Sequence, residues 1–243
     1  MFGIRIIFGL FGVGKGLTNT IIARNEMCDK LAYESALAEI QELETTKQRT
    51  FTYPPQEHIV FSNYKIKFAD IQMSAYDFDP AEFMLPTDEL DFSIFPPYAS
   101  FHVEEGYSGI FSAYDWQKFP AKALEAYSQV RHPRYIFTID LPLIEGLNSR
   151  LRSYAFEYLC PLEIQHEYNC FNYLTKTTSC CAVFHSYNKA LEFEKTKNHD
   201  LIDERREYTF TGNIYDCYDS HNKKEGFFAV GKSKDFVYKE INK

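Results

Sequence analysis

Short apolar runs alternate with amphipathic segments along the chain. Residues 2–9 form an apolar run rich in isoleucine, which predicts a buried strand. From residue 15 to about 47 the pattern changes, and Leu37, Ile40 and Leu43 fall on one stripe among charged residues. This spacing predicts a long amphipathic helix that ends before a pair of prolines.

The remaining chain predicts further strands and one more helix. Apolar runs predict strands, or in the first case a strand or hairpin, within segments 58–68, 99–106, 134–142, 148–160 and 179–187. A helix is expected over 120–132, where Pro120 suits the first turn. Strands that alternate with helices predict an α/β fold with a largely parallel sheet. We expect one domain over residues 1–243, with a helical insertion around 25–50 and an irregular segment around 70–98.

Composition narrows the classes of partner. The 243 residues carry a net charge of -8, which argues against a general electrostatic grip on nucleic acid but leaves room for a local basic patch. None of the six cysteines stands in a CxxC or Cys/His spacing, so no thiolate metal site is expected. Arg5 and several glycines interrupt the N-terminal apolar run, and no apolar stretch approaches the roughly 20 residues that span a bilayer. We expect a cytoplasmic chain with no membrane segment.

The segment after the first strand has the spacing of a phosphate-binding loop. Gly9, Gly14 and Lys15 satisfy the pattern Gly-x-x-x-x-Gly-Lys between a predicted strand and a predicted helix. In such loops, backbone N–H groups point into one concavity, the helix N-terminus adds positive charge, and the lysine reaches the β- and γ-phosphates. The expected nucleotide-binding residues are Gly9, Gly12, Val13, Gly14, Lys15, Gly16 and Leu17.

Gly16 departs from this pattern, because a Ser or Thr normally follows the lysine and its hydroxyl binds Mg²⁺. Thr18 is an alternative ligand only if the helix start is distorted, since two residues along a regular helix it points about 200° away. We therefore expect nucleotide binding with weak hydrolysis, and faster hydrolysis on Gly16→Ser or Gly16→Thr. The alternative for the loop as a whole is an ordinary glycine-rich turn between a strand and a helix.

Two carboxylates end the strand expected near 100–104. Glu104 and Glu105 stand where a P-loop protein places one acid that holds magnesium through water and a second that polarises the attacking water. Two acids after a strand can instead form a solvated strand end. We expect the strand 2–9 to be central and flanked by this strand and by the one near 135–140, so that the loop and the acids meet at one edge.

Basic residues gather in two places along the chain. Arg131, His132 and Arg134 form the first group, and Arg150 and Arg152 form the second. Such a cluster in an acidic chain could contact the phosphates of a neighbouring subunit's nucleotide or of DNA. Salt bridges at the surface and at helix ends are an equal alternative.

In their order along the chain, these motifs resemble the zonula occludens toxin family, which includes the assembly ATPases of filamentous phages. "HVEEG" is similar to the family's strand ending in Asp-Glu, and "GNIYDCYDSH" is similar to its closing motif. The segment from "AYSQVRHP" to "AFEYLC" looks like its following helix, strand and Arg-bearing turn. The resemblance covers residues 2–24, 58–68 and 99–221.

The resemblance implies a P-loop NTPase core of the additional-strand type that binds ATP and Mg²⁺. Its catalytic acid matches Glu105 and its arginine matches Arg131, so the expected catalytic residues are Glu105, Glu104 and Arg131, with Glu104 also holding magnesium through water. The family's work implies a homo-oligomeric ring, phage assembly and membrane proteins as partners, and single-stranded DNA or coat protein as the exported substrate. It also implies a place at the inner face of the membrane, through a partner or a further C-terminal anchor.

Three departures from the family weaken the prediction of fast hydrolysis. Gly16 replaces the hydroxyl residue, Glu104 replaces Asp, and Ile139 stands where the family places a polar sensor of the γ-phosphate. The family also carries a transmembrane helix beyond its closing motif, and this sequence shows none. Two alternatives stay open. One is an inactive nucleotide-binding scaffold in virion assembly or secretion, and the other is a small-molecule kinase, although Leu17 intervenes before the next threonine and no Arg-rich lid is evident.

Overall fold

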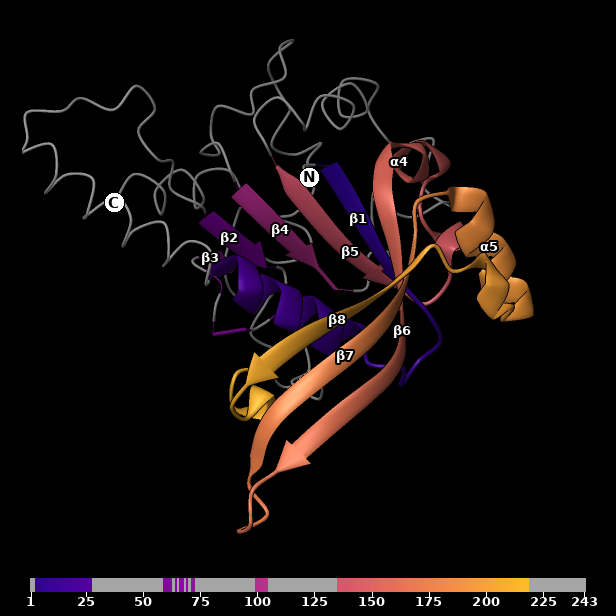
Figure 1. Ribbon diagram of the computed structural model, residues 1–243. Coiled ribbons are helices and arrows are strands. Elements are labelled where there is room, and N and C mark those ends of the chain that lie inside the picture. The colour runs from indigo at the N-terminus through magenta and orange to yellow at the C-terminus, as the bar shows by residue number, and fades with distance from the viewer. Residues whose placement is uncertain are drawn as a thin grey trace, which may run out of the picture.

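The described strands all belong to one twisted sheet (Figure 1). The structure, a computed structural model, describes residues 3–27, 59–62, 64, 66–67, 69, 71–72, 99–104 and 135–218. Its strands are β1 (Gly3–Phe8), β2 (Ile59–Ser62), β3 (Ile71–Gln72), β4 (Ala99–Val103), β5 (Ile136–Leu141), β6 (Ala155–Tyr168), β7 (Leu174–Phe184) and β8 (Glu204–Thr211). Its helical elements are the helix over residues 15–27, α4 (Ser149–Tyr154), α5 (Tyr187–Thr196) and the 3₁₀ turns η4 (Ile144–Gly146), η5 (His199–Leu201) and η6 (Ile214–Asp216).

The strand order is β3-β2-β4-β5-β1-β6-β7-β8, and it confirms the predicted α/β fold with a largely parallel sheet. β1 pairs in parallel with β5 and β6, and β4 pairs in parallel with β5 and β2. β7 and β8 extend the sheet in antiparallel fashion from β6. A strand, a glycine-rich loop and a helix therefore follow one another at the centre of a parallel sheet, which is the P-loop arrangement.

The expected position of the acidic strand is wrong by one strand. β5 lies between β1 and β4, because Ile139 of β5 pairs with Ile6 on one side and with Val103 on the other. An additional strand at this place is what the family resemblance implies. Since all three strands are parallel, their C-terminal ends still meet at the same edge of the sheet.

The two faces of the sheet have opposite characters, as alternation of side chains along a strand allows. One face is an aromatic and aliphatic core, in which Phe101 stacks between Phe61 and Phe137 at centroid distances of 4.8 and 4.4 Å. α5 covers part of this face, where Phe193 packs 4.9 Å from Phe184. The other face receives the helix over residues 15–27.

That second face is polar at its centre. Arg5 of β1 donates from Nε to Glu157 at 2.6 Å and from one terminal nitrogen to Glu26 at 3.2 Å and to Thr138 at 3.2 Å. Burial lowers the pKa of the Arg5 guanidinium, but the carboxylates of Glu26 and Glu157 outweigh this effect and the net pKa lies above its ordinary value. The buried cation thus joins β1, β6 and the helix.

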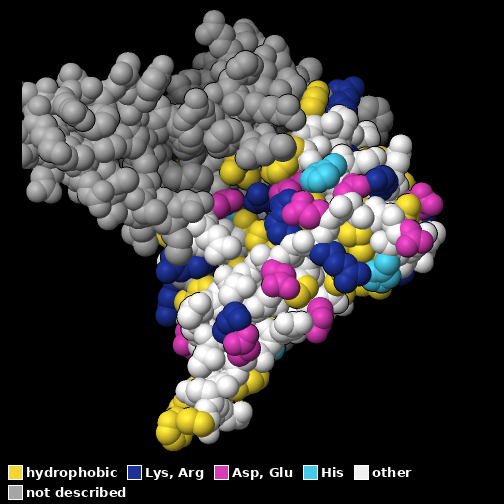
Figure 2. Space-filling model, in the orientation of Figure 1, with side chains coloured by type: hydrophobic (Ala, Val, Ile, Leu, Met, Phe, Trp, Pro, Cys, Tyr) yellow, Lys and Arg dark blue, Asp and Glu magenta, His cyan; other side chains and the backbone are white. Residues whose placement is uncertain are grey.

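β6 and β7 continue past the sheet as a projecting hairpin (Figure 1), and hydrophobic side chains gather at its tip (Figure 2). The exposed aromatic residues there are Tyr168, Phe171 and Tyr173. Asn169 closes the turn by accepting backbone hydrogen bonds from two of them. The length of β6 matters for the site, because it carries Ile164 and His166 toward the loop.

Several predicted segments lie outside the described residues. These are 28–47 of the predicted long helix, the helix over 120–132 and most of the segment 70–98, within which residues 71–72 form β3. The proposed extent of a single domain therefore stays a prediction. Within the part of the chain that the structure describes, no helix is long and apolar enough to cross a membrane.

We predict that Arg5→Met destabilises the protein strongly. The substitution leaves the carboxylates of Glu26 and Glu157 buried without this cation, and breaking such a pair costs about 3–5 kcal/mol. The measurement is the free energy of unfolding in urea. Arg205→Met is the matched control, because Arg205 is exposed on β8 and its loss should cost less than about 0.5 kcal/mol. Equal losses in the two variants would contradict the role of the buried pair.

Candidate functional site

The loop and the ends of two neighbouring strands open onto one cavity of about 420 Å³. The loop and the helix start contribute Phe11, Gly12, Gly14, Lys15, Gly16 and Leu17. The strands and the later segments contribute Glu104, Asp140, Pro142, Ile164, His166, Tyr215 and Tyr218. The cavity thus includes five of the seven predicted nucleotide-binding residues, while Gly9 and Val13 contribute to the loop beside it.

Backbone geometry explains why glycine stands at position 14. Gly14 has φ +87°, a left-handed conformation that residues with a Cβ adopt at a cost. A Cβ at this position would also lie 2.7 Å from Cγ1 of Ile164 in β6. The loop therefore bends tightly under a side chain that comes from a strand 150 residues further along the sequence.

Lys15 lies at the first residue of the helix and reaches back over the loop. Its Nζ donates to the carbonyl oxygen of Leu10 at 3.0 Å and lies 5.5 Å from the centroid of the Phe11 ring. The ammonium group is therefore on the cavity side of the loop, together with the N-terminus of the helix. This arrangement of backbone N–H groups and one cation suits an anion.

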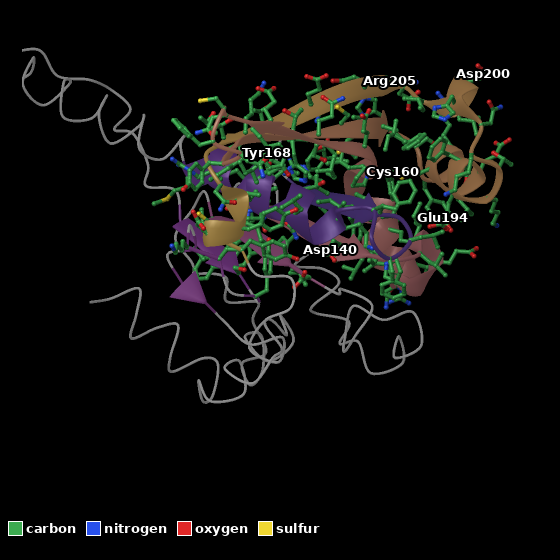
Figure 3. The ribbon with its side chains drawn as sticks, turned by 90° about the horizontal axis from the view of Figure 1, so that it is seen from below. Asp140, Cys160, Tyr168, Glu194, Asp200 and Arg205 are labelled. Atoms are coloured by element: carbon green, nitrogen blue, oxygen red, sulfur yellow. The ribbon has the colours of Figure 1, made fainter. Side chains whose placement is uncertain are left out.

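Two carboxylates from neighbouring strands enter the same cavity. Glu104 follows the last residue of β4, and Asp140, labelled in Figure 3, comes from the C-terminal end of β5 and is 3% exposed. The side-chain amide of Asn19, on the helix, lies 3.4 Å from Asp140 Oδ2. The helix that starts at the loop thus contacts one of the acids.

The assignment of Ile139 to a sensor position is not supported by its placement. Ile139 is fully buried in the apolar core with Phe137 and Leu141, on the face away from the helix. Asp140 points to the other face and lines the cavity. Asp140 was not among the predicted site residues, although the alternation of apolar and polar residues along the strand could have identified it.

The expected gain from a hydroxyl at position 16 conflicts with the packing around Gly16. A Cβ built on Gly16 would lie 2.5 Å from Oε1 of Glu104 and even closer to the hydroxyl oxygen of Tyr218. Either contact requires a neighbour to shift, so Gly16→Ser and Gly16→Thr cannot leave the site unchanged. The approach of Tyr218 to position 16 has no local signal in the sequence, so the expected gain took no account of it.

Thr18, the alternative magnesium ligand, lies away from the cavity. Its hydroxyl donates to the carbonyl oxygen of Gly14 at 2.9 Å and lies 2.6 Å from the hydroxyl of Ser179 in β7. The side chain is fully buried in this contact. Thr18 therefore joins the helix to β7 and to the backbone of the loop, and it is not among the residues that line the cavity.

Glu105 and Arg131 lie outside the described residues, as do His132 and Arg134. Of the second basic group, Arg150 is exposed on α4. Arg152 instead stacks on the ring of Tyr187 in α5 at 4.9 Å and donates to its hydroxyl at 2.8 Å. The structure therefore gives Arg152 a packing role.

A thiol lies near the loop but is not poised as a nucleophile. Sγ of Cys160 lies 3.8 Å from where a Cβ on Gly9 would be. Burial raises the pKa of Cys160 to about 11, so the thiol is protonated near neutral pH. Among the described residues, no three His, Cys, Asp or Glu side chains cluster as a metal site made of protein ligands alone.

Comparisons with known proteins give likenesses of structure only. No protein-family model matches the chain, and no curated protein matches it in sequence. The N-terminal domain of zonular occludens toxin from Neisseria meningitidis has 13% identity and a TM-score of 0.44, over 90% of this chain and 100% of that domain. This solved domain bears the name of the family that the sequence motifs resemble.

A second solved structure is the genome packaging NTPase of Sulfolobus turreted icosahedral virus 2, in complex with ATP-gammaS. It has 12% identity and a TM-score of 0.32, over 70% of this chain and 78% of that one. Both likenesses are distant and concern the arrangement of the chain. The chemistry of the site rests on its own residues.

We predict that Gly14→Ala costs more stability than Gly12→Ala. Both glycines have a left-handed φ, of +87° and +85°, and this conformation alone costs a residue with a Cβ about 1–2 kcal/mol. A Cβ on Gly14 meets Ile164, whereas one on Gly12 meets no atom within 4 Å. Overpacking of this kind adds about 1–3 kcal/mol. Denaturant unfolding of both variants measures the difference, and equal costs would contradict the contact with β6.

Proposed function

We propose that this chain is the ATP-binding P-loop domain of an assembly or export motor of the filamentous-phage type, with weak hydrolysis. The observation that carries the proposal is that one cavity joins the phosphate-type loop to carboxylates from the ends of β4 and β5. Loop amides and Lys15 would bind the phosphates. The carboxylates of Glu104 and Asp140 would lie on the side where magnesium accompanies a nucleotide.

The side chains around the cavity fit a magnesium ion. Mg²⁺ prefers oxygen ligands and in nucleotide sites is held by one or two carboxylates together with the phosphates and water. Glu104 and Asp140 supply such carboxylates, and Tyr218 supplies a hydroxyl oxygen. When bound, the ion would neutralise charge on the phosphates. Glu104 and Asp140 would hold and orient its water ligands.

Weak hydrolysis is proposed because two groups that position the phosphates are altered. Gly16 offers no hydroxyl, and Glu104 takes the place of a shorter Asp. Phosphoryl transfer depends almost entirely on positioning and on charge stabilisation, so both changes slow turnover more than they weaken binding. Glu105 as the base for water and Arg131 as a cation reaching across a subunit boundary complete the proposal.

The proposed role of the motor is in virion assembly. A motor of this kind acts as a homo-oligomeric ring, with phage assembly and membrane proteins as partners and single-stranded DNA or coat protein as its substrate. The alternative is a scaffold in virion assembly that binds nucleotide without turnover. The hydrogen bond between Tyr218 and Glu104 favours this alternative, because it occupies one oxygen of the carboxylate that is expected to hold magnesium.

Lys15→Ala should abolish binding of Mg·ADP and Mg·ATP. Lys15 is the cation that the loop supplies to the cavity. Hydrogen bonds from a charged donor to phosphate are about twice as strong as neutral ones. Isothermal titration calorimetry on the full chain measures the affinities.

Lys195→Ala is the matched control for this experiment. Lys195 lies on α5, its side chain is 60% exposed, and its Nζ lies 3.8 Å from Glu145, so its removal changes the same charge away from the cavity. The control should bind nucleotide like the wild type. Equal binding by Lys15→Ala and the wild type would place the nucleotide elsewhere, and no binding by any of the three would remove the proposed function.

Steady-state hydrolysis of saturating Mg·ATP should be slower than about 1 per second, the lower end of ordinary enzyme rates. The assay is release of inorganic phosphate, carried out at several protein concentrations so that any oligomer contributes. Lys15→Ala measures the background from contaminating ATPases. A wild-type rate at or above this value would show that the site positions phosphate well, and the proposal of weak hydrolysis would be wrong.

A further inference from the structure

Tyr218 is brought to the cavity by the turn that follows β8. Asn213 caps η6 by accepting from the backbone N–H of Tyr215, and Ile214 anchors the turn in a buried apolar cluster. The ring of Tyr218 packs in the same cluster, in an edge contact with Tyr64 at 5.8 Å between centroids. Tyr218 as a whole is 6% exposed, and its side chain lines the cavity wall.

That hydroxyl lies where a side chain at position 16 would begin. It donates to Oε1 of Glu104 at 2.8 Å, and both oxygens stand closer to an imagined Cβ on Gly16 than any real Cβ contact permits. Carbon Cζ of the ring is 3.2 Å from the same point. A serine hydroxyl at position 16 and the Tyr218 hydroxyl would therefore compete for one volume.

We infer that Tyr218 supplies the hydroxyl that the loop lacks at Gly16, and that it is a positioning residue for Glu104 and for the water shell of the nucleotide's divalent cation. This inference rests on the proposed function. A phenol is both donor and acceptor, so a hydroxyl that donates to Glu104 can still accept from a metal-bound water. Position 16 must then be glycine, because a side chain there would collide with the Tyr218 hydroxyl.

Charge and packing favour this role over a purely structural one. A tyrosine that served only the apolar cluster could direct its hydroxyl to solvent, whereas this one directs it to a carboxylate at the end of the acidic strand. The bond holds Glu104 against the start of the helix, beside Gly16 and Lys15. Groups that orient metal-holding carboxylates typically change metal affinity by about 10- to 100-fold when removed.

The test uses three variants of the full chain with matched shapes. Tyr218→Phe removes the hydroxyl and keeps the ring. Gly16→Ser combined with Tyr218→Phe moves a hydroxyl from the ring to the loop. Gly16→Ala combined with Tyr218→Phe adds the same Cβ without a hydroxyl. In both double variants the Cβ meets the ring at about 3.2 Å, and the end of the Glu104 side chain can move aside.

The readout is the affinity for the non-hydrolysable analogue AMPPNP, measured by calorimetry with MgCl₂ and with EDTA. Tyr218→Phe should reduce the gain from Mg²⁺ by about tenfold and leave the affinity in EDTA unchanged. The double variant with serine should recover most of this gain, and the one with alanine should not. A gain from Mg²⁺ that is equal in the wild type and Tyr218→Phe overturns the inference, as does recovery with alanine.

A second measurement keeps the hydroxyl in place, so that it does not depend on the folding of Tyr218→Phe. 3-Fluorotyrosine incorporated at position 218 should show a ¹⁹F shift on addition of Mg·AMPPNP that exceeds the shift with AMPPNP in EDTA. Equal shifts overturn the inference while the proposed function stands, since the nucleotide still binds. Failure of the wild type to bind AMPPNP under either condition overturns both.

Discussion

The fold depends on one buried cation, the guanidinium of Arg5 at the centre of the sheet. Glu157 from the neighbouring strand and Glu26 from the helix after the loop hold it. A buried charge is tolerated only when it is paired and hydrogen-bonded, so β1, β6 and the helix must adopt one mutual position. Because this helix begins at Lys15, the same constraint determines where the loop lies over the end of β1.

The ion pairs continue as a chain of polar contacts toward the cavity. The ring nitrogens of the fully buried His102 lie 2.7 Å from Oδ1 of Asn19 and 2.8 Å from Oε2 of Glu26. The side-chain amide nitrogen of Asn19 faces Asp140, and its oxygen faces the histidine ring. Polar contacts thus form one path through Asp140, Asn19, His102, Glu26, Arg5, Glu157 and Arg206. The path ties the cavity to the outer strand β8.

Sequence alone could predict the loop, the parallel sheet and the acidic strand, because each has a local pattern. It could also have found Asp140, which alternates with buried apolar residues in β5. It could not find β8, whose residues are mostly exposed and include only Phe210 as a buried one, because the alternation of Tyr208 and Phe210 with threonines is too short to identify a strand. Nor could it place Tyr218 beside Glu104, 114 residues away, because such a contact follows from tertiary packing rather than from spacing.

The shared volume at Gly16 and Tyr218 makes the two positions epistatic. In a lineage that keeps this backbone, serine enters position 16 only after the phenol at position 218 has gone, because the reverse order passes through a colliding intermediate. Relatives with a hydroxyl in the loop and relatives with a hydroxyl from the closing segment would then form two groups separated by paired substitutions. A comparison of the loops alone would find no hydroxyl in the second group, although one comes from the segment that follows β8.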